Sequence, residues 1–406
     1  MKQSLFKSPT NVIFCKKCVQ SNQKVLSSSL ISDDTAHSNR TRMGFKDGIC
    51  DGCLQVERKY NQDIDWKERE KKLNKILEKY RSRNGSFDCI VPGSGGKDSV
   101  FQAEILKKKY KMNPLTVTFS PHIYTEAGMK NFHNWPLWGD VHNFLYTPSG
   151  IVHRKLTELA FKKLLHPFQP FIFGQRHFAS HMALMHKIPL IFMGESQSEA
   201  GSSDEIDEIM MKYEYWSKSE NQKILISGCE LDELEKKYNI TKNDLKFYLP
   251  NDIDTLKKND IRVLYLGEFE KFEPQENYYL ATKVSRFVAN SERTPQTFSK
   301  YSSIDDKIDS FHYYTAYVKF GYGRCTEEAT KEIRHKYITR SEGVNLVHKY
   351  DHEFPKKYFD DFIEYIDCKE EEFYEILDKF RPEHLWEKVG NDYRFCNNWK
   401  LKHKVQ

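Results

Sequence analysis

The sequence predicts an α/β protein whose parallel β-sheet carries helices on both faces. Three observations predict this fold. Short apolar runs alternate with amphipathic helical patterns between residues 86 and 270, as in parallel sheets covered by helices. Two C-x-x-C pairs stand within the first 53 residues, which indicates a separate N-terminal module. Helical patterns dominate after residue 271, so we expect a mostly helical C-terminal region.

The composition is that of a globular, soluble protein. The 406 residues are 39% hydrophobic and 30% charged, with a net charge of +5. The basic residues form no block of the kind that nucleic-acid arms carry, so nucleic acid is not an expected partner. No apolar run approaches the roughly 18 residues of a membrane helix, and residues 1–14 lack the apolar stretch of a secretory signal. We expect a cytoplasmic protein without a membrane partner.

Four early cysteines have the spacing of a metal site. Cys15 and Cys18 form one C-x-x-C pair, and Cys50 and Cys53 form the other. Each pair presents two thiolates from a tight turn, and four thiolates complete the tetrahedral shell of Zn²⁺. A closed shell of this kind is structural rather than catalytic. Reduced thiols and a redox pair are the alternatives.

The chain divides into four expected parts. We predict a zinc module over residues 1–60, a helical connector over 61–85, a ligand-binding sheet domain over 86–270, and a helical region over 271–406 that contacts the substrate or a partner. The connector is predicted because Leu73, Leu77 and Tyr80 recur at partial helical spacing. Residues 84 and 85, Asn and Gly, supply a stop.

The sheet domain is expected to consist of short buried strands joined by helices. The predicted strands cover residues 87–91, 115–119, 144–146, 188–193 and 262–266, and the predicted helices cover residues 99–110, 154–165 and 178–186. Ligands of such sheets bind beyond the carboxyl ends of the strands. Two segments are expected at that edge: the Gly-rich turn after the first strand, and Gly194-Glu195 after the fourth.

The Gly-rich turn is the strongest chemical signal. Glycines let the backbone approach an anion and expose successive N–H groups, and the following helix N-terminus favours phosphate. Lys97 offers a positive charge for a leaving group, and Asp98 offers a ligand for Mg²⁺. The spacing fits neither a Walker loop nor the dinucleotide G-x-G-x-x-G pattern. A turn without a ligand is the alternative.

The string Ser94-Gly95-Gly96-Lys97-Asp98-Ser99 resembles the PP-loop of the ATP pyrophosphatases, whose fold is the adenine-nucleotide α-hydrolase type. Enzymes with this loop leave AMP on a substrate oxygen and release pyrophosphate. The resemblance implies ATP and Mg²⁺ as cofactors. We expect Lys97, Asp98 and Glu195 to be catalytic. The expected ATP-binding residues are Gly93, Ser94, Gly95, Gly96, Lys97, Asp98, Ser99, Thr118, Gly174, Gln175 and Gly194.

The chain as a whole resembles the N-acetyl sugar amidotransferases. The likeness rests on the two cysteine pairs, the loop, and the strings at residues 189–195, 319–324, 338–343 and 384–388. It is greatest to enzymes of pseudaminic acid biosynthesis. The resemblance implies that an acetamido group of a nonulosonic acid is converted to an acetamidino group through an adenylated imidate, for flagellin glycans. Because such a substrate carries a carboxylate, Arg176 and Arg324 are the expected substrate-binding residues.

The source of ammonia is expected to lie outside the chain. No G-x-C-x-G glutaminase elbow occurs, and residue 2 is Lys, so a separate glutaminase subunit is an expected partner. Two other functions remain open. A tRNA thiolation enzyme would need a cysteine pair near the nucleotide, where only Cys89 stands. A non-catalytic subunit would bind ATP without releasing pyrophosphate.

Overall fold

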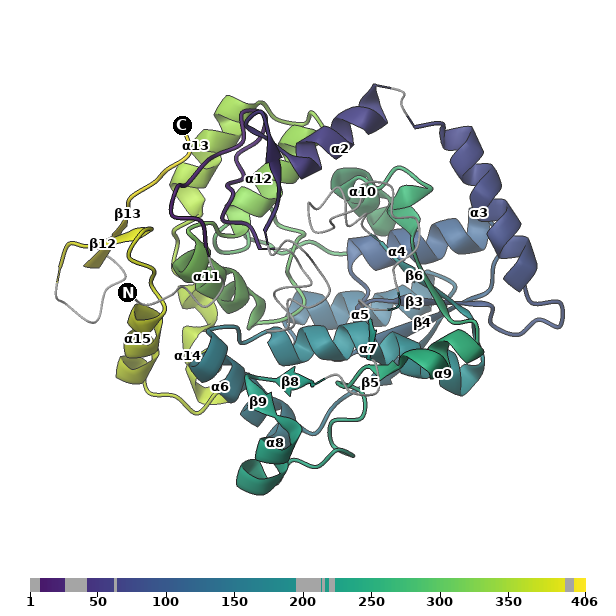
Figure 1. Ribbon diagram of the computed structural model, residues 1–406. Coiled ribbons are helices and arrows are strands. Elements are labelled where there is room, and N and C mark those ends of the chain that lie inside the picture. Colours follow the sequence, from purple (N-terminus) through teal and green to yellow (C-terminus); the bar gives the residue numbers. More distant parts are fainter. Residues whose placement is uncertain are drawn as a thin grey trace.

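The computed structural model describes residues 8–25, 42–61, 64–194, 213, 216–218, 223–390 and 398–406. The sheet with its helices occupies one side of the molecule and the C-terminal helices occupy the other (Figure 1). The N-terminal segment lies across the C-terminal helices, which are far from it in the sequence but close to it in space. Among the described residues, no helix has both the length and the apolar character that crossing a membrane requires.

The central sheet has five parallel strands. They are, in spatial order, β11 (Arg262–Tyr265), β6 (Leu190–Met193), β3 (Cys89–Pro92), β4 (Pro114–Phe119) and β5 (His142–Tyr146). All five predicted strands are therefore confirmed, with ends shifted by at most two residues. The chain runs outward from β3 to β5 and then returns to place β6 on the other side of β3. A ligand crevice is expected where the order reverses, at the carboxyl ends of β3 and β6.

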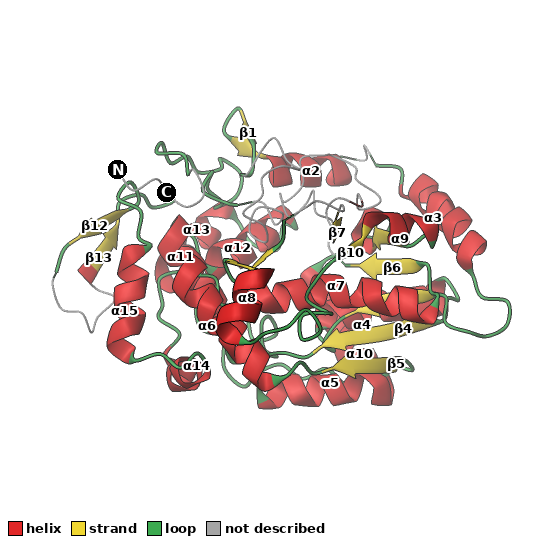
Figure 2. Cartoon of the chain, turned by 60° about the horizontal axis from the view of Figure 1, so that its bottom comes forward, coloured by secondary structure: helices red, strands yellow, loops and turns green. Residues whose placement is uncertain are grey.

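Helices cover both faces of the sheet, as predicted (Figure 2). Successive residues of a strand point to opposite faces. Ile90 of β3 belongs to one apolar cluster, with residues of α6 (Gly150–Leu164) and α7 (Gln169–His186). Its neighbours Cys89 and Val91 belong to the other cluster. That second cluster also takes residues of α3 (Trp66–Tyr80), α4 (Lys97–Glu104), α5 (Glu126–Trp138) and α10 (Pro274–Val284).

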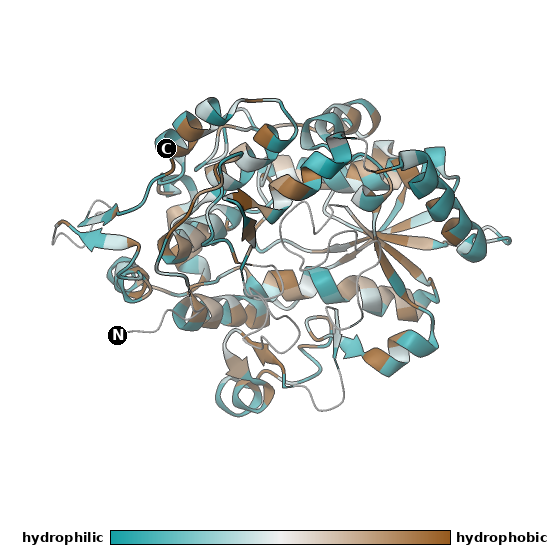
Figure 3. Cartoon of the chain, turned by 45° about the horizontal axis from the view of Figure 1, so that its top comes forward, coloured by the Kyte–Doolittle hydropathy of each residue, from teal (hydrophilic) through white to brown (hydrophobic). Residues whose placement is uncertain are grey.

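Hydropathy follows this layering. The strands of the sheet are largely apolar, whereas the helices carry both hydrophilic and hydrophobic residues (Figure 3). Strands that are buried on both faces read as continuous apolar runs, and this is why they stood out in the sequence. The edge strand β5 differs, because Phe144 and Leu145 are exposed.

The C-terminal region is mostly helical, as predicted. Its helices are α11 (Asp309–Phe320), α12 (Arg324–Arg334), α13 (Arg340–Tyr350), α14 (Phe359–Tyr365) and α15 (Glu370–Lys379). A two-stranded sheet of β12 (Trp386–Lys388) and β13 (Trp399–Leu401), which the sequence did not predict, follows them. The described residues also form shorter elements elsewhere in the chain. These are β1 (Phe45–Lys46), β2 (Ile49–Cys50), α2 (Asp51–Tyr60), η2 (Ile105–Lys109), β7 (Ser217–Lys218), β8 (Leu225–Ile226), β9 (Cys229–Glu230), α8 (Leu231–Tyr238), β10 (Asn251–Asp252), α9 (Ile253–Lys258), η4 (Leu266–Glu268) and η5 (Lys356–Tyr358).

The helix before β6 begins nine residues earlier than predicted. The sequence placed Gly174 and its polar neighbours after an apolar run, and began a helix at residue 178. In the structure α7 already begins at Gln169. Pro170 stands in its first turn, where proline is tolerated. Phe171, Phe178 and Met182 are all buried on one side, at the spacing of a helical face. The apolar run is therefore the start of a helix.

Candidate functional site

The Gly-rich turn is a tightly packed connection between β3 and α4. Gly96 is the N-cap of α4. Gly95 has φ +80°, a left-handed conformation, and a Cβ atom there would lie 2.7 Å from the carbonyl oxygen of Asn131. A Cβ atom on Gly93 would overlap the Ser99 side chain. Only glycine fits at both positions, and the turn brings the backbone to the carboxyl edge of the sheet, at the N-terminus of a helix.

Side-chain hydrogen bonds within the turn, and to Thr118 and Asp305 outside it, hold the turn in place. Thr118 of β4 donates a hydrogen bond to the Gly93 carbonyl (2.6 Å), and Ser99 donates to the Gly96 carbonyl (2.9 Å). Ser94 donates to a carboxylate oxygen of Asp305 at 2.7 Å. Thr118 does not line the cavity described below, so its place in the structure is that of a support for the turn.

Lys97 and Asp98 form an ion pair at the start of α4. The Lys97 Nζ atom lies 2.6 Å from one carboxylate oxygen of Asp98. The other oxygen accepts a hydrogen bond from the Asn277 amide at 2.8 Å. Lys97 is only 8% exposed, so its charge is held near the turn rather than in solvent. A carboxylate and an ammonium that neutralise each other here could separate to meet a metal ion and a phosphate.

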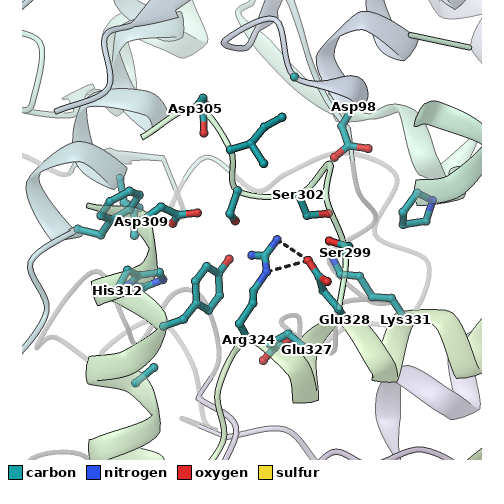
Figure 4. A pocket seen from close by; sticks show the side chains of 18 of the residues that line it. Asp98, Ser299, Ser302, Asp305, Asp309, His312, Arg324, Glu327, Glu328 and Lys331 are labelled. Atoms are coloured by element: carbon teal, nitrogen blue, oxygen red, sulfur yellow. Dashed lines mark hydrogen bonds and ion pairs between the residues drawn. The ribbon is translucent and has the colours of Figure 1, made fainter. Parts of the chain in front are cut away.

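A cavity of about 640 Å³ lies between this turn and the C-terminal helices. Its volume is that of a site for a small organic ligand. The turn contributes Gly93, Ser94, Gly96, Lys97, Asp98 and Ser99. Facing them are side chains from α11, α12 and the segment before them, among them Asp305, Asp309, His312, Arg324, Glu328 and Lys331 (Figure 4). The cavity thus joins two parts of the chain that the sequence treats as separate regions.

Arg324 stands in the centre of the view of the cavity, in the first turn of α12. Its Nε and Nη2 atoms bond one carboxylate oxygen of Glu328 at 2.9 and 2.8 Å. Its guanidinium lies 4.3 Å from the ring centroid of Tyr313. Burial alone would lower the pKa of Arg324, but Tyr313, Glu328 and Asp309 more than offset this and raise it. The cation is therefore permanent.

Burial raises the pKa of three carboxyl groups that line the cavity. Burial raises the pKa of Asp309 to about 7 and that of Glu332 to about 7. Burial also raises the pKa of Asp305, which accepts the bond from Ser94. Several shifted carboxyls in one cavity are typical of functional sites.

Some buried polar atoms that line the cavity have no hydrogen-bond partner in the described part of the chain. They belong to Gln20, Gln102, His166, His312 and Thr330. The rings of His166 and His312 stack at 5.0 Å, and burial lowers the pKa of His312 to about 3, which keeps it neutral. Buried polar groups are nearly always paired in folded proteins. A ligand with several hydroxyl or amide groups would supply these partners.

The structure gathers many of the predicted site residues and leaves some apart. Every predicted residue of the turn except Gly95 lines the cavity, together with Gln175 and Arg324. Gly174 instead packs against the ring of Phe119, and Gly194 follows β6 opposite the Gln102 side chain. Arg176 does not line the cavity and is close to Tyr265 at the end of β11. The predicted catalytic Glu195 lies outside the described residues.

The four predicted metal ligands come together in one buried cluster. The sulfur atoms of Cys15, Cys18, Cys50 and Cys53 all lie within 4.8 Å of one another. The Cys18 and Cys50 sulfurs are 3.6 Å apart, and the Cys15 and Cys53 sulfurs are 3.9 Å apart. Tetrahedral zinc with bonds of about 2.3 Å places thiolate sulfurs about 3.8 Å apart. The cluster therefore fits a four-coordinate zinc ion with a closed shell.

Hydrogen bonds to sulfur support the same interpretation. Backbone N–H groups of Lys17, Gln20 and Cys50 donate to cluster sulfurs at 3.4 to 3.5 Å. The Nη2 atom of Arg334 donates to the Cys50 sulfur at 3.3 Å. Donors that surround a thiolate stabilise its charge, as partners of metal ligands commonly do.

The cavity residues after position 295 fall in a region similar to known proteins. Residues 295–404 match the family model "LPS biosynthesis protein WbpG-like, C-terminal domain", which fits a sugar-modifying family. The chain is also 34% identical over 83 residues to "Uncharacterized protein MJ1599" of Methanocaldococcus jannaschii. That match covers 20% of this chain and 29% of the relative, so the chain spans less than a third of that protein. Asp305, Asp309 and Arg324 all lie in the stretch of the family model.

Proposed function

We propose that this chain is an ATP-dependent amidotransferase that converts the N-acetyl group of a sugar acid to an acetamidino group. One observation carries the proposal. A single cavity is lined on one side by the turn after β3 and on the other by a C-terminal region similar to a lipopolysaccharide biosynthesis domain. A nucleotide bound at the turn and a sugar bound at α11 and α12 would meet there.

The turn is the proposed ATP site, of the PP-loop type. Its exposed N–H groups and the N-terminus of α4 favour the phosphates. Lys97 would neutralise charge on the departing pyrophosphate, and Asp98 would hold Mg²⁺. Mg²⁺, when bound at Asp98, would supply positive charge that stabilises the negative charge of the phosphates. Mutual neutralisation of Lys97 and Asp98 keeps both in place until ATP arrives.

The reaction follows from the poor leaving ability of an amide oxygen. The acetamido oxygen attacks the α-phosphorus of ATP, a bond to phosphorus forms, and pyrophosphate leaves. Ammonia then adds to the imidate carbon, and AMP leaves with the former amide oxygen while the released protons pass to solvent. The protein has to align the amide oxygen with the phosphorus, which is a positioning effect. The ammonia would come from outside the chain, for example from a separate glutaminase subunit in the cytoplasm.

Arg324 is the proposed partner of the sugar carboxylate. Its Nε and Nη2 atoms pair with Glu328, and Nη1 makes no hydrogen bond with the described residues. Burial in the cavity strengthens a charge-assisted bond from this nitrogen. Arg176, the other expected arginine, is not proposed, since it does not line the cavity.

Two substrates are consistent with this site. The strings that resemble pseudaminic acid enzymes favour that nonulosonic acid, for flagellin glycans. The match of residues 295–404 favours an N-acetylated sugar of lipopolysaccharide. A tRNA thiolation function is less well supported, because Cys89 is fully buried in β3 and no cysteine among the described residues lines the cavity.

The cysteine cluster is proposed to hold a structural zinc ion. Zinc would fix the N-terminal segment, which has few apolar residues of its own, against α12 and α13.

The proposed reaction is tested by its two products. ATP, Mg²⁺ and ammonium are incubated with pseudaminic acid or, separately, with an N-acetylated lipopolysaccharide sugar. We expect AMP and pyrophosphate only with the correct sugar, and a sugar product lighter by the difference between oxygen and NH. AMP without this mass change would contradict amidine formation, and ATP binding without AMP release would favour a non-catalytic subunit.

A further inference from the structure

The cysteine module and the cavity share a wall. Gln20, Lys24, Val25 and Met43, all from the N-terminal part of the chain, line the cavity. Gln20 is only two positions beyond the metal-ligand candidate Cys18. Figure 1 shows the N-terminal segment beside α12. The module therefore does more than cap the C-terminal helices, because part of its surface faces the space that a ligand would fill.

The backbone of Gln20 is fixed while its side chain is unsatisfied. Its N–H donates to the Cys18 sulfur at 3.5 Å, and its carbonyl accepts from the Cys15 N–H at 2.8 Å. The side chain is 0% exposed. Neither its amide nitrogen nor its amide oxygen makes a hydrogen bond within the described part of the chain. A buried carboxamide without partners is costly, and a ligand in the cavity would remove that cost.

Helix α12 links this wall to the metal cluster. Arg324 at its start lies in the cavity, and Arg334 at its end both lines the cavity and donates to the Cys50 sulfur. Lys24 pairs with Glu327 of the same helix at 2.5 and 2.6 Å. The cluster, Gln20 and the sugar end of the cavity are therefore parts of one packed body, and displacement of one would displace the others.

We propose that Gln20 hydrogen-bonds the sugar substrate, so that the cysteine module forms one wall of the sugar site and sugar binding is linked to metal retention. This inference rests on the proposed function, which supplies the ligand class. A carboxamide offers two donors and one carbonyl acceptor, which suits the hydroxyl and N-acetyl groups of a sugar. It carries no charge for a phosphate, and ATP is assigned to the turn at the other end of the cavity.

Linkage makes this proposal measurable without turnover. If the sugar binds only when the zinc-loaded module forms its wall of the cavity, bound sugar stabilises the zinc-loaded module. By thermodynamic linkage, bound zinc raises the affinity for the sugar to the same extent. Sugar should therefore slow the loss of zinc to a chelator. A variant without the Gln20 amide should lose that protection while still binding zinc, because the side chain is not a metal ligand.

The test uses the full-length, zinc-loaded protein with Gln20→Ala and the volume-preserving Gln20→Met. Gln55→Ala is the matched control. Gln55 lies in α2 of the same module, is 1% exposed, and has an amide nitrogen without a partner among the described residues, but it does not line the cavity. Zinc content, ATP affinity by calorimetry, KM for pseudaminic acid and the rate of zinc loss are measured.

We expect both Gln20 variants to keep zinc and ATP affinity and to raise the KM for pseudaminic acid about tenfold, the usual effect of removing one or two ligand hydrogen bonds. Pseudaminic acid should slow zinc loss from the wild type and from Gln55→Ala, but not from the Gln20 variants. An unchanged KM would overturn the proposal. Loss of zinc from both Gln20 variants would overturn it too, since Gln20 would then be part of the module's own structure.

Failure of the inference is distinguishable from failure of the proposed function. Sugar-dependent AMP with unaltered kinetics of the Gln20 variants overturns the inference alone. If the wild type forms no AMP but pseudaminic acid still slows zinc loss in a Gln20-dependent manner, the amidotransferase reaction is wrong and the binding site stands. If neither pseudaminic acid nor the N-acetylated lipopolysaccharide sugar gives AMP or slows zinc loss with the wild type, both are overturned.

Discussion

Lys97 and Asp98 form an ion pair with each other, which holds both charged side chains at the site in the absence of a ligand. Each is the other's partner, and Asn277 fixes the second oxygen of Asp98. The sequence predicted both residues from their place in the turn. It gave no sign of Asn277, which lies 179 positions away from Asp98.

Replacing Lys97 by Ala should lower AMP formation by about 10²- to 10³-fold, as removal of one group that stabilises developing charge typically does. The affinity for ATP should fall less, since the turn N–H groups remain. Lys107→Ala is the control, because Lys107 pairs with Asp140 away from the cavity. The comparison is made from kcat/KM and from calorimetric titration. Equal rates for the two variants would exclude a catalytic Lys97.

The Asp309→Asn substitution should make the free energy of unfolding of the protein depend less on pH. Burial raises the pKa of Asp309 to about 7, whereas an unfolded Asp ionises near its ordinary value of about 3.9. The folded state thus holds the proton longer, and stability falls as pH rises from about 4 to 7. We expect the variant to match the wild type at pH 4 and to be more stable at pH 8, by up to about 4 kcal/mol.

Urea unfolding at both pH values measures this difference, with Asp360→Asn as a surface control on the exposed side of α14. A variant that is less stable than the wild type at pH 8 would mean that the Asp309 carboxylate is favourable as the anion, in contradiction to the buried environment described above.

At the scale of elements, the turn between β3 and α4 depends on close packing as much as on backbone conformation. Gly95 and Gly85 both have positive φ, +80° and +81°. A Cβ atom on Gly95 would meet the backbone of Asn131, whereas on Gly85 it would meet nothing within 4 Å. Alanine at position 85 would therefore show the cost of the left-handed conformation alone, whereas alanine at position 95 would add the cost of steric overlap.

We expect Gly85→Ala to cost about 1 to 2 kcal/mol, the strain of a left-handed alanine. Gly95→Ala should cost more and should also abolish detectable ATP binding, because the turn has to move away from Asn131. Urea unfolding and calorimetry measure the two effects. ATP affinity retained in Gly95→Ala would show that the nucleotide does not bind at this turn.

The elements themselves were predictable to different degrees. Buried strands such as β3 and β6 are short apolar runs, and their pairing in a parallel sheet follows from the helices between them. The start of α7 was missed because residues 171–173 near its start form a short continuous apolar run that fits strand and helix equally well. The sheet of β12 and β13 was missed because three-residue strands have too little periodicity to stand out.

At the scale of the whole molecule, the cavity is made by contacts that no local pattern shows. The bond between Ser94 and Asp305 joins residues 211 positions apart, and Lys24 meets Glu327 across 303 positions. The sequence predicted the turn and the cysteine pairs, whose chemistry is local. It could not place Gln20, Asp309 or His312 around the same cavity as the turn, because only the packing of distant segments brings them there.

Loss of the metal should destabilise more than the N-terminal module. Arg334 and Arg340 donate to the sulfur of Cys50 and to the backbone carbonyls of Cys15 and Cys18, so the cluster is attached to α12 and α13. We expect Cys18→Ser to lose zinc and to lower the Tm of the whole chain, since metal-binding energy is also folding energy. Cys368→Ser, outside the cluster, is the control. Metal analysis and thermal unfolding measure both. An unchanged Tm after zinc loss would show that the module is energetically separate.

In the proposed reaction, the amide oxygen of the sugar is transferred to AMP. The most direct measurement uses pseudaminic acid that carries a heavy oxygen isotope in its acetamido groups, with ATP, Mg²⁺ and ammonium, and reads the mass of the AMP formed. An adenylated imidate predicts one heavy oxygen in each AMP and an unlabelled acetamidino group in the sugar. AMP of ordinary mass, with the isotope retained in the sugar, would contradict it.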